Sequence, residues 1–222
     1  MMTNLFSVFD PSSILNAQLN WAASLLSILT LPCLFWMSST RLSKACKKIM
    51  GALAVEWSSL LSPQNKPILV FLTALFTFIL MNNTLGLLPF IFTPTAHLAT
   101  TLALALVPWT GYFLYKALND AYRLLAHMVP QSTPGLLMPL MVLIETLSNI
   151  IRPLTLAIRL SANMIAGHLL ITLMSSTASA LTPSLSLLII LMQTPLMILE
   201  SAVAVIQAYV FSTLCTLYIQ EA

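Results

Sequence analysis

Two apolar segments, 136–174 and 184–219, restrict the fold of this chain more than any other feature of its sequence. As continuous α-helices they would be about 58 Å and 54 Å long, at 1.5 Å per residue. The hydrocarbon core of a bilayer is only about 30 Å thick. Each segment therefore either breaks into two crossings, near Pro153 and Pro195, or forms one long, strongly tilted helix. A polar stripe along each segment favours tilted helices that pack against another protein.

The composition places the rest of the chain in the membrane as well. Of its 222 residues, 59% are hydrophobic and 7% are charged, whereas ordinary soluble domains carry about 25% charged residues. The net charge of +3 is too small for a nucleic-acid-binding surface. We expect an all-α integral membrane protein with about six helices in a single domain, residues 1–222. The N-terminus resembles neither a secretory signal nor a transit peptide, so the first helix is expected to remain in the mature chain.

The segments before the two long ones have recognisable patterns. Arg41, Lys44 and Lys48 recur at helical spacing, opposite Ile49 and Leu53, which predicts a helix lying in the membrane interface. Turn-forming residues between the apolar runs predict one span before this helix and a hairpin of two spans after it. The expected elements are a span at 14–37, the interfacial helix at 41–61, the hairpin at 68–114, a polar connection at 116–134, a long helix at 136–174, a turn at 175–183 and a second long helix at 184–219.

A permanent cation lies inside the first long segment. Placing Arg159 in hydrocarbon costs roughly 2.5–3.5 kcal/mol on insertion scales, and arginine cannot escape this cost by losing its proton. A charge kept at membrane depth marks an ion or proton pathway with an acidic partner. Glu145 is about 21 Å away along the helix axis. We therefore expect the counter-charge to come from Glu200 or from another chain.

Polar residues follow one side of each long segment. At about 100° per residue, those of the first segment fall within roughly 80° of Arg159. In the second segment, Gln193, Glu200 and Gln207 recur every seven residues, with Tyr218 close to the same line. Each helix is therefore predicted to present one polar strip that faces either water or another protein. The members of the first strip besides Arg159 are Glu145, Ser148, Asn149, Arg152, Thr155 and Asn163.

Several of these residues admit both a structural and a functional interpretation. Glu200 lies between Leu199 and an apolar run, an environment that suits a group exchanging protons near neutral pH. Gln207 fits a hydrogen-bonding or orienting role. His168 points away from Arg159 and is either a satisfied core histidine or a functional one. Asn82 and Asn83, inside the second span, are expected to hydrogen-bond to a neighbouring helix, with a conduction role as the alternative.

Enzymatic chemistry has no basis in this sequence. It contains no phosphate-binding glycine loop, nucleophile elbow or metal-ligand cluster. Its three cysteines lie far apart and are expected to act as small apolar side chains. We therefore expect no covalent catalysis by this chain alone, no cofactor and no metal.

The sequence around Arg159 closely resembles one family. The run RPLTLAIRLSANMIAGHLL, residues 152–170, is similar to the F-type ATP synthase subunits a, which are stator proton-channel subunits. NTLGLLP at 83–89, IETLS at 144–148 and ESAVAVIQAYVF at 200–211 agree with the same family. The resemblance covers most of the chain from about Leu80 onward. The histidine at 168 and the glutamate at 200 look like the mitochondrial form.

This resemblance implies a mechanism, partners and a location. It implies that Arg159 faces the carboxylate of a rotating ring of proteolipid subunits, between two offset aqueous half-channels. His168 and Glu200 would line the half-channel on the intermembrane side, supported by Asn163 and Gln207. Glu145 would lie toward the matrix exit. The implied partners are the proteolipid ring, the peripheral stalk, other membrane-sector subunits, lipid and protons, in the mitochondrial inner membrane.

Two alternatives belong to other classes of protein. In a proton-pumping or antiporter-like subunit of a respiratory complex, Glu145, Arg152 and Arg159 would form an internal relay, although such subunits usually carry intramembrane lysines that these segments lack. In a non-conducting scaffold, the charges would only hold helices in register. The sequence leaves open whether Glu145 and Arg152 form a structural pair or part of an exit path.

Overall fold

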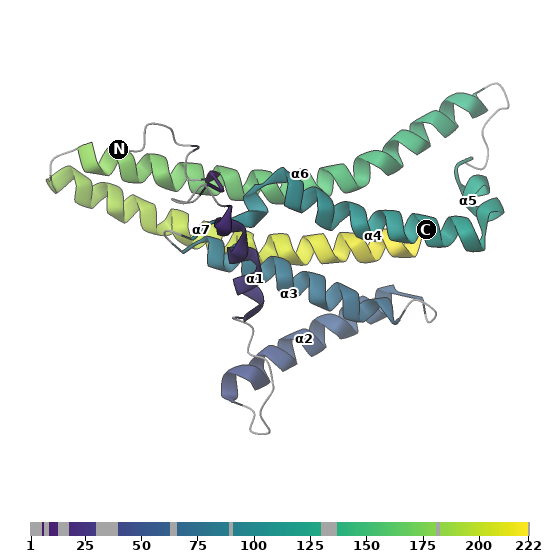
Figure 1. Ribbon diagram of the computed structural model, residues 1–222, viewed down its shortest axis with the longest axis horizontal. Helices are drawn as coiled ribbons and strands as arrows, with labels where there is room; N and C mark the ends of the chain where they lie inside the picture. Colours follow the sequence, from purple (N-terminus) through teal and green to yellow (C-terminus); the bar gives the residue numbers. More distant parts are fainter. Residues whose placement is uncertain are drawn as a thin grey trace.

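The computed structural model describes residues 6, 9–12, 18–29, 40–62, 66–88, 91–129, 137–180 and 183–221 (Figure 1). Within these ranges all regular structure is helical, as the composition predicts, and four helices are long and apolar enough to cross a membrane: α3, α4, α6 and α7. The expected span at 14–37 is described only between residues 18 and 29. The helices are α1 (Ala22–Leu29), α2 (Arg41–Leu60), α3 (Ile68–Gly86), α4 (Leu98–Asn119), α5 (Ala121–His127), α6 (Met138–Ala180) and α7 (Pro183–Glu221), with 3₁₀ turns at Leu19–Trp21 and Pro94–Ala96.

The two long apolar segments each form one unbroken helix. Pro153 lies inside α6 and Pro195 inside α7, so neither proline divides its helix into two crossings. A proline is tolerated inside an apolar helix where neighbouring helices and local adjustments compensate for the missing hydrogen bond. At 1.5 Å per residue each helix is about 60 Å long, roughly twice the thickness of a hydrocarbon core. The structure thus selects the long-helix alternative.

The turn predicted at 175–183 is wrong over most of its length, because α6 continues to Ala180. The small hydroxyl residues of this stretch do not end the helix. Ser175, Ser176 and Thr177 each donate a hydrogen bond to the backbone carbonyl three residues earlier, at 2.8–2.9 Å. Serine and threonine can satisfy their hydroxyls in this way without leaving the helical conformation.

The polar connection predicted at 116–134 is also wrong in its first half. Helix α4 continues past Lys116 to Asn119, and α5 follows directly after Asp120. Leu118, Tyr122 and Leu125 occur at helical spacing in this stretch and are largely exposed. The stretch from Lys116 to His127 is therefore helical on both sides of Asp120, whose own backbone is not helical.

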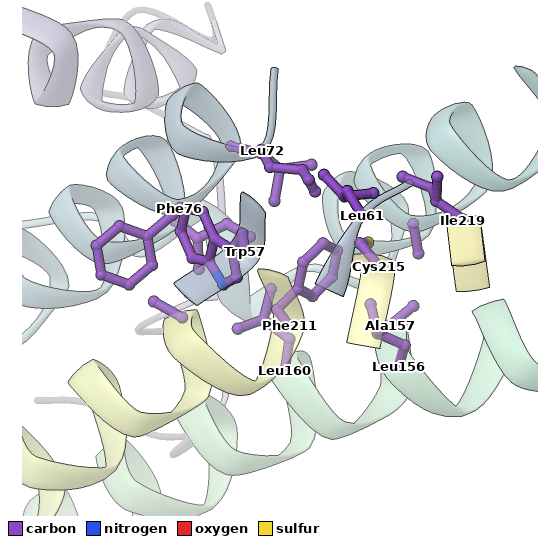
Figure 2. Close-up of a cluster of buried hydrophobic side chains, with 14 residues drawn as sticks. Trp57, Leu61, Leu72, Phe76, Leu156, Ala157, Leu160, Phe211, Cys215 and Ile219 are labelled. Atoms are coloured by element: carbon purple, nitrogen blue, oxygen red, sulfur yellow. The ribbon is translucent and has the colours of Figure 1, made fainter. Parts of the chain in front are cut away.

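Helices α3 and α4 are separate candidate spans that pack mainly on the long helices, α3 against α7 and α4 against α6, and hardly on each other. The two long helices lie side by side, and the N-terminal part of α6 diverges from the bundle (Figure 1). Buried apolar side chains of α2, α3, α6 and α7 meet in one cluster (Figure 2). One side of α6 and one side of α7 are buried in this cluster. The packing therefore determines which residues of the two helices remain exposed. Its labelled members are Trp57, Leu61, Leu72, Phe76, Leu156, Ala157, Leu160, Phe211, Cys215 and Ile219.

Helix α2 is fixed to this cluster by one large side chain. Trp57 is fully buried, and its ring lies 5.8 Å from that of Phe76 in an edge-on arrangement. The Tyr209 hydroxyl of α7 also donates a hydrogen bond to the Glu56 carboxylate at 3.4 Å. At its other end, the Thr40 hydroxyl caps α2 by accepting a hydrogen bond from the Ser43 backbone N–H at 3.3 Å.

We expect the substitution Trp57→Ala to release α2 from the bundle. Removing a fully buried tryptophan costs about 3–5 kcal/mol, and no other described α2 side chain is as large and as deeply buried. Trypsin should therefore cleave at the α2 lysines faster in membranes that contain the variant. Ser59→Ala serves as the control, since Ser59 is exposed and bonds only within its own helix. Equal cleavage rates in the two variants would contradict this role for Trp57.

Candidate functional site

The packing of α6 directs Arg159 away from the bundle. Leu156, Ala157 and Leu160 on the same turns are buried in the apolar cluster (Figure 2), whereas Arg159 is exposed. Among the described residues, Arg159 forms no ion pair. Neither Glu145 nor Glu200 therefore neutralises this cation within the chain.

A hydrogen bond joins the two polar strips close to Arg159. The Asn163 side-chain amide of α6 donates a hydrogen bond to the Gln207 side-chain carbonyl of α7 at 3.0 Å. Gln207 is buried and Asn163 is exposed. This bond joins residues 44 positions apart in the sequence and lies one helical turn from Arg159.

Glu200 of α7 is buried against Gly167 of α6. It is only 4% exposed, and neither carboxylate oxygen has a hydrogen-bond partner in the described part of the protein. Burying a carboxylate without partners is costly, so this group is expected to exchange its proton or to bind water. A Cβ atom added at Gly167 would lie 2.5 Å from Glu200 Oε1. Gly167 therefore provides the space that the carboxylate occupies.

This function of Gly167 was not predicted from the sequence. Small residues on membrane helices permit the close approach of a neighbouring helix or side chain. A small residue in this segment therefore indicates a close contact. The side chain that fills the space, Glu200, is 33 positions away in the sequence. Only the packing of α6 on α7 identifies Glu200 as that residue.

His168 follows Gly167 directly and is partly buried. Its Nε2 atom is buried without a hydrogen-bond partner in the described residues, and its ring contacts that of Phe9 edge-on at 6.2 Å. Two asparagines of α3 are also buried. The Asn83 side-chain amide donates a hydrogen bond to the backbone carbonyl of Ala204 at 3.4 Å, which confirms the predicted contact with a neighbouring helix. Asn82 instead bonds to the Phe78 carbonyl of its own helix.

Glu145 lies in a separate cavity of about 270 Å³. The cavity is bounded by α4, α5, α6 and α7 and combines charged, amide and aromatic side chains. The Arg152 guanidinium lies over the Tyr218 ring, 5.7 Å from its centroid. Lys116, the first residue of the stretch expected to be a polar connection, also contributes to this wall. The polar and aromatic lining comprises Trp109, Tyr112, Phe113, Lys116, Glu145, Asn149, Arg152 and Tyr218.

The predicted site residues thus form two groups on opposite sides of Arg159. Glu200, His168, Asn163 and Gln207 lie toward the C-terminal half of α6, and the Glu145 cavity lies toward its N-terminal half. The 23 residues from Glu145 to His168 correspond to about 35 Å along the helix. In the described ranges, no group of three or more histidine, cysteine or acidic side chains is arranged to hold a metal ion.

Together the fold and the site define a polytopic α-helical membrane protein with ionisable side chains within its long apolar helices. Proteins of this class use such groups for ion or proton pathways.

Comparison with known proteins identifies the family. The profile of the family described as ATP synthase A chain matches residues 19–220. ATP synthase subunit a of Drosophila melanogaster is 50% identical over 223 residues, covering 100% of this chain and 99% of that protein. The corresponding subunits of Anopheles quadrimaculatus and Locusta migratoria are 52% and 48% identical, with the same coverage. The chain belongs to the ATP synthase A chain family. This membership supports a role in the membrane sector of ATP synthase and argues against the antiporter-like alternative.

Proposed function

We propose that this chain is the proton-conducting stator subunit of the ATP synthase membrane sector in the mitochondrial inner membrane. Its main partner is a ring of proteolipid subunits, each with one membrane carboxylate, and it also contacts the peripheral stalk and other membrane-sector subunits. The chain forms two half-channels and performs no covalent catalysis itself.

The exposed guanidinium of Arg159, unpaired within the described residues, is the observation that carries this proposal. A permanent cation at membrane depth needs a counter-ion, and the described part of the chain does not supply one. A carboxylate on a neighbouring protein meets this need. Because the ring rotates, each carboxylate meets Arg159 in turn and then leaves it.

The two groups of polar residues are assigned to the two half-channels. Glu200, His168, Asn163 and Gln207 conduct protons from the intermembrane side, since they include buried polar atoms with no partner in the described protein. The Glu145 cavity leads to the matrix exit, since it is the polar space on the other side of Arg159. A proton cannot pass directly from one group to the other without passing Arg159.

Arg159 then couples proton movement to rotation. Its positive charge favours the ionised form of an approaching ring carboxylate, which releases its proton to the exit side. The carboxylate takes up a new proton from the intermembrane half-channel and returns through lipid as a neutral acid. Each proton that crosses is worth about 2.3 kcal/mol per 100 mV of membrane potential. Arg159 prevents this energy from being lost by direct transfer between the half-channels.

A disulfide crosslink tests whether the ring faces Arg159. The native cysteines are replaced by serine, and a cysteine is introduced either at Thr155 or at Leu154. These neighbouring positions are both exposed but differ by about 100° around α6, and Thr155 lies on the Arg159 side. In the assembled complex, the Thr155→Cys variant should crosslink to a cysteine in the ring helix that bears the carboxylate. The Leu154→Cys variant is the matched control. Equal crosslinking at both positions, or at neither, would exclude the proposed ring contact.

A further inference from the structure

The first half of α2 carries a dense basic surface that the proposed proton path does not use. Four of the nine basic residues of the chain lie within its first eight positions, and all four are exposed. Glu56 is the only acidic residue of α2, so the four basic residues and one acidic residue leave the helix with a net charge of +3. The four basic residues, here called the α2 basic face, are Arg41, Lys44, Lys47 and Lys48.

The packing of α2 turns this face away from the rest of the chain. Trp57 is buried in the apolar cluster, and Met50 and Leu53 pack against it from the same side of the helix. At about 100° per residue, Lys44 and Lys48 lie roughly 140° and 180° around the helix from Trp57. The N-terminal half of α2 extends outside the bundle formed by α3, α4, α6 and α7 (Figure 1).

Exposed apolar side chains accompany the basic ones. Ile49 is 59% exposed and Val55 is 69% exposed, and Val55 lies on the same side of α2 as Lys44 and Lys48. A surface that combines lysines with exposed aliphatic groups matches the boundary between lipid headgroups and acyl chains. Lysine side chains can keep their stems in the apolar layer while the ammonium groups reach the phosphates.

We propose that the α2 basic face binds the headgroups of anionic phospholipids in the leaflet next to it. Each basic residue near an anionic membrane surface favours binding by about fivefold. The Trp57 contact and the Thr40 cap hold the helix, so the four cationic groups are presented together on one ordered backbone. This binding is separate from proton conduction and does not depend on Arg159.

Photolabelling of the intact complex tests the proposal. The complex is reconstituted into phosphatidylcholine vesicles that contain a photoreactive phosphatidylglycerol or, in parallel, a photoreactive phosphatidylcholine. Labelled α2 peptides are then measured by mass spectrometry. We expect the anionic probe to label α2 several-fold more than the zwitterionic probe. In the double variant Lys44→Gln/Lys48→Gln most of this preference should be lost, so that the two probes label α2 nearly equally.

Two further variants make the result specific. Lys44→Arg/Lys48→Arg preserves the charge and should retain the preference. Lys66→Gln removes an exposed lysine outside α2 and should leave it unchanged. Equal labelling by both probes in the unmodified complex would overturn the proposal. So would a preference that survives the glutamine substitutions, or an α2 that no lipid probe reaches because another subunit covers it.

Discussion

Replacing Arg159 with alanine is expected to abolish ATP synthesis driven by a proton gradient. Loss of one preorganised hydrogen-bond donor at a reacting centre typically slows the reaction by about 10²–10³-fold. Arg159 carries a full charge and is also proposed to separate the two half-channels. Without it, a ring carboxylate has no fixed cation to favour its ionised form at the stator. Protons could also pass between the half-channels without rotation. The variant should therefore lose synthesis and leak protons faster.

The rate of ATP synthesis and the rate of proton leak can both be measured in sealed membrane vesicles. The rate of ATP synthesis is followed after an imposed pH difference, and the decay of that difference is followed with the catalytic sector inhibited. Arg159→Lys should restore little synthesis, because a lysine in a dry environment can lose its proton. Leu154→Ala, at an exposed position about 140° around α6 from Arg159, is the control and should behave normally. Normal proton-driven synthesis in the Arg159→Ala variant would refute the assigned function of this residue.

Replacing Glu200 with glutamine should slow proton uptake without loss of assembly. Glutamine has nearly the same shape and fits beside Gly167, but it cannot carry a proton between water and the ring. Loss of a proton-transfer group typically costs on the order of 10²-fold in rate. The initial rate of synthesis should fall by a comparable factor, while the amount of assembled complex, measured on native gels, should not change. Failure of the complex to assemble would indicate a structural function for Glu200.

The substitution Gly167→Ala is a second way to disturb the Glu200 carboxylate. The added methyl group would overlap the Glu200 carboxylate, because a Cβ atom at this position would lie 2.5 Å from the nearer carboxylate oxygen. The carboxylate must then move, so synthesis should slow in the same direction as in Glu200→Gln. In a double variant the second substitution should add little, because both act on one group. Independent, multiplicative effects would show that Gly167 and Glu200 act separately.

The membrane class of the protein and its central cation follow from the sequence. An apolar segment of about 39 residues has no stable position outside a membrane or a very large core. Placing an arginine within such a segment costs free energy. The arginine cannot avoid this cost by losing its proton, and its own helix does not remove it. These conclusions depend on composition and local spacing alone. They are therefore available before any tertiary contact is known.

Local spacing was less reliable where polar residues suggested loops. Residues 116–127 and 175–180 are largely helical because apolar side chains recur at helical spacing in the first stretch and hydroxyls bond to backbone carbonyls in the second. Whether Pro153 and Pro195 break their helices was also undecided. A proline removes one hydrogen bond, and the neighbouring helices decide whether the remaining bonds keep the helix continuous.

The arrangement of the candidate site required the tertiary structure. The sequence identified Glu200, Gln207, Asn163 and His168 as separate polar residues on two helices. Only the packing of α6 on α7 joins Asn163 to Gln207 and places the Glu200 carboxylate in the space left by Gly167. Helical periodicity determines which side of its own helix a residue occupies. It contains no information about the rotation and offset of a second helix, which depend on how the side chains of all the helices fill the core together.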